Sequence, residues 1–200
     1  MKTIFVYLWL FTSLSAQVLA QSRISIAPTY WFNYGIYAYQ VQSTYSGIGG
    51  SFAGRDLASS AGLTARYHFS PKWDVSVGLL YNWNASHLTE SPTGYGTNPF
   101  RSKALQLPIL VNYRLTTHQL SPYFSGGAFL VKSKTFSEAP TKVNGVLGVG
   151  LDYRIRSGLS VMVQATASYL FYKPADDLYF QFANYSSYSL GAQTQLIWHF

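Results

Sequence analysis

The sequence predicts an all-β fold, an eight-stranded antiparallel up-and-down transmembrane β-barrel. First, apolar and polar residues alternate along many segments, including the last, where Leu196, Trp198 and Phe200 share one face. Second, the chain has 17 Tyr, 13 Phe and 5 Trp beside only 14 basic and 7 acidic residues. Third, no stretch beyond the N-terminal region is apolar enough for a membrane helix, so any membrane-spanning structure must be a closed barrel.

The N-terminal segment predicts export. Lys2 precedes an almost entirely apolar stretch over 4–14, and Val18-Leu19-Ala20 suits a signal peptidase, so residues 1–20 are interpreted as a signal peptide. A transmembrane anchor is the alternative, but a spanning helix needs roughly 20 apolar residues. The sequence has no Cys and hence no lipid-acceptor cysteine or disulfide. Residues 21–200 are expected to form one barrel domain.

Eight segments alternate as strands, with short and long connections in turn. They are expected at 23–38, 57–69, 73–86, 101–115, 121–133, 142–154, 158–172 and 186–200. The short connections fall at 70–72, 116–120 and 155–157, and the long ones at 39–56, 87–100, 134–141 and 173–185. Because outer-membrane barrels have short periplasmic turns, both termini are predicted to lie in the periplasm.

The third strand has the length of a membrane crossing. Its apolar face runs from Trp73 to Trp83, about 34 Å of strand that a tilt of about 40° projects to about 26 Å, close to the apolar band of about 25 Å. Aromatic residues at both borders suit two lipid–water interfaces and disfavour a soluble lipocalin-type barrel with its apolar face inside. The predicted aromatic girdle comprises Trp73, Tyr81, Trp83, Tyr113, Tyr153, Tyr169 and Phe171.

The inward-facing parity supplies polar side chains that can fill a narrow barrel. We expect a buried ion network, because unpaired interior charges are costly. Its predicted members are Arg66, Asp74, Arg114, Asp152 and Arg154, and Phe124 and Lys132 are also placed inside. A filled interior predicts a structural or surface-interaction role, with a narrow porin-like channel as the alternative. Although the net charge is +7, the basic residues are scattered, and no nucleic-acid partner is expected.

Several segments resemble a known family. The signal peptide, LQLPILVNYRL at 105–115, SPYFSGG at 121–127 and GVLGVGLDY at 145–153 are similar to small outer-membrane β-barrel ("porin family") proteins of Bacteroidota. The resemblance implies delivery by periplasmic chaperones to the barrel-assembly machinery. It also implies a C-terminal assembly signal, with matches at Gly191, Leu196, Trp198 and Phe200.

Catalysis is not expected, although some barrels of this size modify lipid A. Ser86, His87 and Glu90 form the only comparable cluster, and Ser86 and His87 are strand neighbours that point to opposite faces. His68, His118 and His199 have no second ligand at metal spacing, so no metal or cofactor is predicted. A lipid-A-modifying enzyme remains the weaker alternative.

The outer end of the barrel provides the remaining candidates for binding. The predicted loops 39–56 and 173–185 carry aromatic residues that could contact an extracellular ligand or extend the girdle. Arg101 and Lys103 share the lipid-facing parity at the upper end of the fourth strand. They are candidate contacts for lipopolysaccharide phosphates, in a membrane whose lipid is the barrel's main partner.

Overall fold

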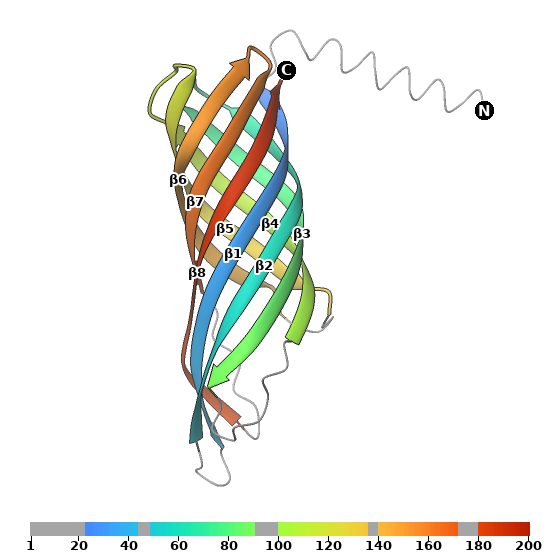
Figure 1. Ribbon diagram of the computed structural model, residues 1–200, viewed down its shortest axis with the longest axis vertical. Helices are drawn as coiled ribbons and strands as arrows, with labels where there is room; N and C mark the ends of the chain where they lie inside the picture. Colours follow the sequence, from blue (N-terminus) through green and yellow to red (C-terminus); the bar gives the residue numbers. More distant parts are fainter. Residues whose placement is uncertain (1–22, 44–48, 91–99, 136–139, 172–179) are drawn as a thin grey trace, which may run out of the picture.

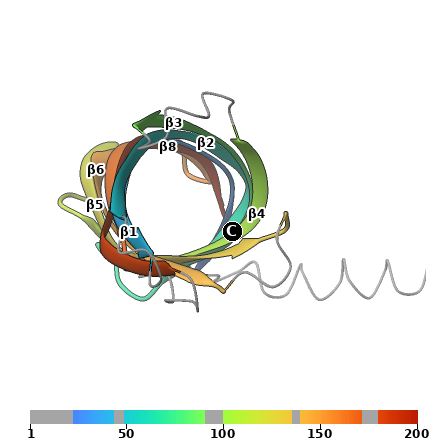
Figure 2. The same cartoon turned by 90° about the horizontal axis from the view of Figure 1, so that it is seen from below.

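The computed structural model describes residues 23–43, 49–90, 100–135, 140–171 and 180–200, with the side chains of Glu90, Phe180 and Phe182 left out (Figure 1). Eight strands pair antiparallel in chain order, and β8 closes the ring against β1, as the view along the barrel shows (Figure 2). Their bounds are β1 Ile24–Ser43, β2 Gly49–His68, β3 Trp73–Glu90, β4 Phe100–Arg114, β5 Leu120–Ser133, β6 Lys142–Arg156, β7 Leu159–Leu170 and β8 Phe180–His199. The predicted fold is confirmed, and the proposed signal peptide lies outside the described residues.

The barrel is apolar outside and polar inside. Leu147 and Leu190 on the outer surface are 70% and 68% exposed, whereas Arg66 and Gln106 inside are 2% and 1% exposed. This is the reverse of a soluble barrel, because the alternating residues turn their large apolar side chains away from the interior. None of the described segments is a helix with the length and hydropathy to span a membrane.

The predicted girdle residues all lie on the outer-facing side of their strands in two groups. Near the short turns, the rings of Trp73 and Tyr113 are 4.7 Å apart between centroids. Toward the other end, Tyr81 lies 4.8 Å from Trp83. There, Tyr169 lies 5.2 Å from the Phe171 ring, and Tyr153 is exposed beside the turns.

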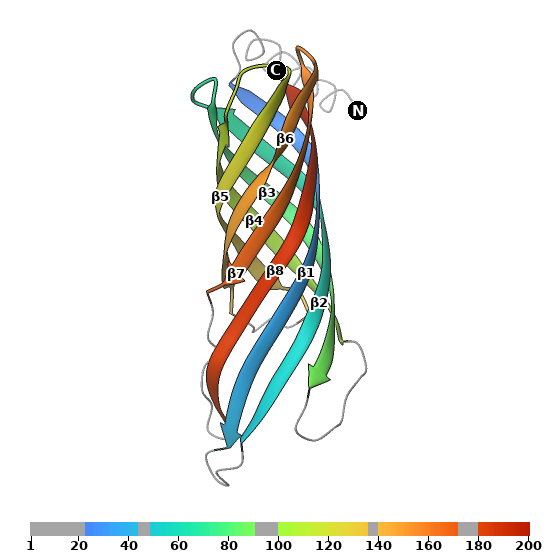
Figure 3. The ribbon, with the colours of Figure 1, turned by 60° about the vertical axis from the view of Figure 1, so that its left-hand side comes forward.

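Four strands, β1, β2, β3 and β8, extend by four or more residues beyond their predicted bounds, and β3 reaches Glu90 within the expected loop 87–100. Within the expected loop at 39–56, the described residues are strand, since β1 continues to Ser43 and β2 begins at Gly49. β8 likewise begins at Phe180, inside the expected loop 173–185. These ends project opposite the C-terminus (Figures 1 and 3). They pair with one another, and this cross-strand bonding compensates for the weak strand preference of their Gly and Ser residues.

The predicted facing of β5 was wrong. Phe124 is 44% exposed and Lys132 is exposed, so both point outward, while Tyr123 and Phe129 are buried inside. Aromatic and small residues occur on both faces of this strand, so alternation alone does not select the inner one. Pairing with β4 and β6 determines it.

Candidate functional site

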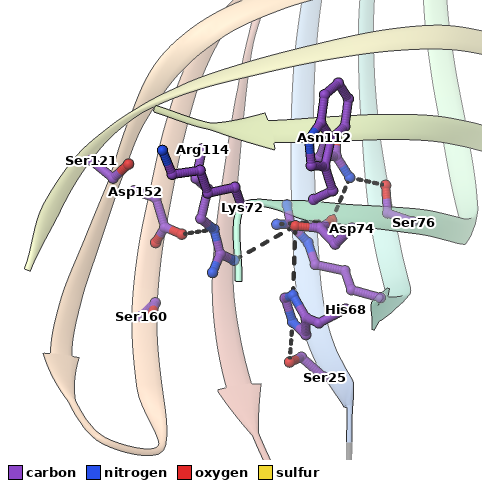
Figure 4. Close-up of polar contacts among 12 residues, drawn as sticks. Ser25, His68, Lys72, Asp74, Ser76, Asn112, Arg114, Ser121, Asp152 and Ser160 are labelled. Atoms are coloured by element: carbon purple, nitrogen blue, oxygen red, sulfur yellow. Dashed lines mark hydrogen bonds and ion pairs between the residues drawn. The ribbon is translucent and has the colours of Figure 1, made fainter. Parts of the chain in front are cut away.

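A buried ion cluster fills the end of the barrel near the short turns (Figure 4). Asp74 on β3 lies between two arginines, 3.8 Å from Arg66 and 3.7 Å from Arg114. Arg114 Nε lies 2.8 Å from Asp152 Oδ2 on β6, as an ion pair whose N–H is not aligned for a hydrogen bond. The two arginines and the two aspartates therefore carry no net charge together. This pairing reduces the cost of burying charges in an interior of low dielectric constant.

Neutral groups surround these charges. Asn112 Nδ2 donates to Asp74 at 2.6 Å and to Ser76 at 3.0 Å. Arg66 donates to Gln195 and lies 5.3 Å from the ring centroid of Tyr123, which the sequence analysis had not placed inside. Four of the five predicted network residues thus come together.

Arg154 differs from the other predicted network residues. It is exposed near the end of β6, where the pairing with β7 shifts register, and therefore lies outside the buried cluster. The bulge places it at the solvent-accessible mouth, where its charge needs no buried partner.

A series of polar side chains leads from the ion cluster toward the opening of the barrel at the short-turn end. Ser25 Oγ lies 2.8 Å from both His68 Nε2 and His199 Nδ1, and His199 Nε2 lies 2.8 Å from Ser160 Oγ. His68 Nδ1 lies 3.7 Å from Asp74. Both histidines follow the inward parity of their strands, and their common serine depends on the register of three strands.

An apolar cluster occupies the lumen beyond the charges. Trp31 on β1 and Phe129 on β5 meet edge to face, with ring centroids 5.5 Å apart and planes at 67°. β1 and β5 are opposite strands of the ring, so this contact crosses the full width of the barrel. The Trp31 indole donates to Thr166 Oγ1 at 2.9 Å. We call this set the apolar plug: Trp31, Leu80, Leu110, Phe129 and Val146.

A cavity of about 380 Å³ opens above the apolar plug at the end with the long strands. We call it the vestibule. Phe129 and Gln106 line it near the plug, and Tyr37, Tyr39 and Tyr185 line its wall. Tyr39, expected in the loop at 39–56, instead follows the inward parity of β1 together with Tyr37. The ring of Tyr37 packs over Gly54, where an added Cβ would approach it to 2.2 Å.

The outer face of the barrel carries a group of cations. Arg101 and Lys103 are exposed and follow the outward parity of β4, as predicted. Lys134 N donates to Lys103 O at 2.8 Å, and Lys134 Nζ lies 5.7 Å from the Tyr81 ring centroid. Lys132 faces the same side of β5. Lys132 was placed inside because the predicted facing of β5 was wrong, and Lys134 lies just beyond β5, in the expected loop 134–141.

The residues of the predicted assembly signal lie along β8. Trp198 and Phe200 are 43% and 48% exposed on the outer face, and Leu196 is half-buried there. Gly191 has the opposite parity, and a Cβ there would come within 2.2 Å of the Phe32 carbonyl oxygen. Glycine is required at this position by the close approach of β1.

Ser86 and His87, considered as catalytic residues, lie on opposite faces of β3. Ser86 lines the vestibule and His87 is exposed outside. The side chain of Glu90 lies outside the described part of the chain.

A protein-family model agrees with this architecture, and several solved structures are similar to the chain. The family model described as "Outer membrane protein beta-barrel domain" matches residues 7–193. No curated protein matches the sequence significantly. Among solved structures, OprG from Pseudomonas aeruginosa is 13% identical with a TM-score of 0.46, over 90% of this chain and 99% of that one. Neisserial surface protein A is 12% identical with a TM-score of 0.41, over 87% and 96%.

The outer membrane protein AlkL, solved in lipid bilayers, is 10% identical with a TM-score of 0.47, over 87% of this chain and 90% of that one. The family match covers most of the sequence, including all or part of every strand. The chain belongs to the outer membrane protein beta-barrel domain family and is an integral outer-membrane β-barrel.

Proposed function

We propose that this protein is a non-conducting barrel with a structural or surface-interaction role at the cell envelope. The contact between Trp31 and Phe129 is the observation that carries the proposal, because it joins opposite walls of the lumen. In the proposed orientation, the short turns and both termini lie in the periplasm, and the vestibule opens at the cell surface.

Two layers of side chains in the lumen support the proposal that ions do not pass through the barrel. The apolar plug offers a permeating ion no hydrogen-bonding side chain except at its edges, and a narrow apolar constriction excludes water. Below it, Arg66, Asp74, Arg114 and Asp152 are held in a neutral cluster. An ion would have to cross both layers, and the alternative of a narrow porin-like channel would require both to rearrange.

Planar-bilayer recording tests the proposal. The purified wild-type barrel should show no stable single-channel steps. Combining Trp31→Ala and Phe129→Ala with Arg66→Ala and Asp74→Ala should produce them, because side chains are then removed from both layers while the lumen stays neutral. Phe124→Ala is the matched control, since it removes the same side chain from the outer face of the same strand. Stable steps from the wild-type protein would reject the proposal.

We also propose that the outer-face cations bind lipopolysaccharide phosphates. Arg101 and Lys103 lie on β4 toward the vestibule end, and Lys134 lies just beyond the end of the adjacent β5. In the proposed orientation all three reach the outer leaflet. Tyr81 packs beneath Lys134, so an aromatic residue at the interface supports a cation facing the headgroups. The contact would be charge-assisted and salt-dependent.

The proposed role is not enzymatic. Ser86 and His87 point to opposite sides of the barrel wall, so they cannot act as a nucleophile–base pair. Incubating the purified barrel with lipid A and measuring the lipid mass tests this, and loss or gain of an acyl chain would contradict it. From the resemblance of the sequence, we also propose that periplasmic chaperones deliver the chain to the barrel-assembly machinery. The same resemblance supports a Bacteroidota origin.

A further inference from the structure

Three buried polar atoms of the vestibule wall lack a hydrogen-bond partner among the described residues. They are Asp56 Oδ1, Asn84 Oδ1 and Gln106 Nε2, contributed by β2, β3 and β4. The Asp56 carboxyl itself also interacts with the side chains of Ser86 and Asn84. Gln106 is only 1% exposed, and its other amide atom, Oε1, accepts from Ser60 at 2.9 Å. A buried polar atom without a partner costs about 1–3 kcal/mol, so these positions favour a ligand that supplies the missing bonds.

To pair all three atoms, a ligand must offer both hydrogen-bond donors and hydrogen-bond acceptors. The Asp56 and Asn84 oxygens accept hydrogen bonds, whereas the Gln106 amide nitrogen donates. A hydroxyl group both donates and accepts, so a molecule with several hydroxyls can satisfy all three atoms. A purely apolar ligand would leave them unpaired, and a simple cation or anion would satisfy only one kind.

Aromatic rings form the wall above these polar atoms. Tyr39 stacks on Phe52 with centroids 5.1 Å apart and planes at 11°, and on Tyr185 at 6.0 Å and 26°. Tyr37 lies parallel to Tyr39 at 6.4 Å. Of these four rings, those of Tyr37, Tyr39 and Tyr185 line the vestibule. Flat aromatic surfaces pack well against the C–H face of a sugar ring.

A β-bulge places Tyr185 in this wall. The register between β1 and β8 shifts between Ala38 and Gln40, and Asn184 on β8 has a positive φ of 51°. Asn184 Nδ2 donates to Gln40 Oε1 at 2.7 Å, which holds the extra residue in place. Bulges of this kind orient side chains at functional sites.

The charges in the vestibule do not favour an ionic ligand. Asp56 and Lys142 lie on opposite strands of the ring and interact electrostatically across the cavity. Lys103, another charged lining residue, is exposed on the outward parity of β4. The cavity of about 380 Å³ is near the lower end of ligand sites, which span roughly 300–1,000 Å³.

From these observations we infer that the vestibule binds the end of a neutral carbohydrate chain. The aromatic wall packs against the sugar rings, while Asp56, Asn84 and Gln106 bond to their hydroxyls. The inference deepens the proposed function, on which it rests for access of the vestibule to the cell exterior.

A glycan array with the purified full-length barrel tests the inference. The protein is kept in a detergent without a sugar headgroup, because a maltoside would compete for the site. The array carries neutral and anionic oligosaccharides, including lipopolysaccharide-core sugars and glycans absent from bacterial envelopes. Neutral glycans should bind, and titration calorimetry with the strongest one gives the affinity.

Two variants test the site itself. Asn84→Leu and Gln106→Leu each remove one ligand-facing polar group at similar volume, and each should weaken binding about tenfold. Gln193→Leu is the matched control. Gln193 is as buried as Gln106, and its Nε2 also has no hydrogen-bond partner among the described residues, but it lies outside the vestibule. Its replacement should therefore leave the affinity unchanged. Heat-modifiable gel migration checks that each variant is folded.

The outcomes separate this inference from the proposed function. Absence of neutral-glycan binding, binding of anionic glycans alone, or unchanged affinity in both vestibule variants would overturn it. None of these results depends on conductance, which tests the proposed function separately. Preference for core sugars would indicate a ligand in the protein's own membrane, and preference for the other glycans would indicate an external one; either supports the inference.

Discussion

Trp31 and Phe129 meet edge to face across the barrel, with 5.5 Å between ring centroids, although they are carried by opposite strands. This contact divides the interior into two compartments of different chemistry. On one side, a neutral set of paired charges fills the lumen. On the other, a vestibule with aromatic walls is open to solvent.

Arg114 should contribute far more to stability than Arg154. Arg114→Gln removes the cation shared by Asp74 and Asp152, leaves buried carboxylates poorly paired and should lower the free energy of unfolding by about 3–5 kcal/mol. Arg154→Gln, at an exposed position, should change it by less than about 0.5 kcal/mol. Denaturant unfolding in micelles measures both, and equal effects would show that the cluster is not a stabilising unit.

The conformation of Asn184 should matter more than its side-chain hydrogen bond. Asn184→Gly and Asn184→Val both remove the bond to Gln40, but only glycine adopts a positive φ without strain. Asn184→Val should therefore be about 1–3 kcal/mol less stable than Asn184→Gly. Unfolding of the two variants under the same conditions measures this difference. Equal stabilities would contradict the prediction, because they would show that valine at this position does not strain the bulge or that the bulge can be lost without a change in free energy.

The outer-face cations should retain lipopolysaccharide. Replacing Arg101, Lys103 and Lys134 with Gln should leave the barrel folded and reduce the lipopolysaccharide that co-purifies with it, more so at low salt.

The matched control replaces three exposed cations at the opposite end of the barrel with Gln: Arg23, Lys72 and Arg156. Their removal should leave the lipid content unchanged. The lipid hypothesis fails if both triple variants carry the wild-type amount.

Phe200 should act in assembly. Phe200→Ala should reduce the fraction of protein inserted in the outer membrane, because the side chain lies on the outer face of β8 beside Trp198, within the segment interpreted as the assembly signal. Phe171→Ala removes another exposed outer aromatic residue and serves as the control. Heat-modifiable migration of membrane fractions measures insertion. Equal losses would indicate only a general need for interfacial aromatic residues.

Alternation along the sequence was sufficient to predict eight strands, the closed barrel and the facing of strands such as β3, but not the facing of β5. The segment from Trp73 to Trp83 illustrates why: facing in a strand follows from a local period of two, and the apolar length matches one membrane crossing. The same local period of two predicted that Arg66, Asp74, Arg114 and Asp152 face the interior.

The tertiary structure decided which of these side chains meet. The plug contact, the serine shared by two histidines and the inward facing of Tyr123 depend on register between strands that are distant in the sequence. The strand character of residues 39–43 and 49–56, expected to be loop, likewise depends on pairing within the barrel. A local period specifies the face on which a side chain lies, whereas only closure of the ring specifies its neighbours across the lumen.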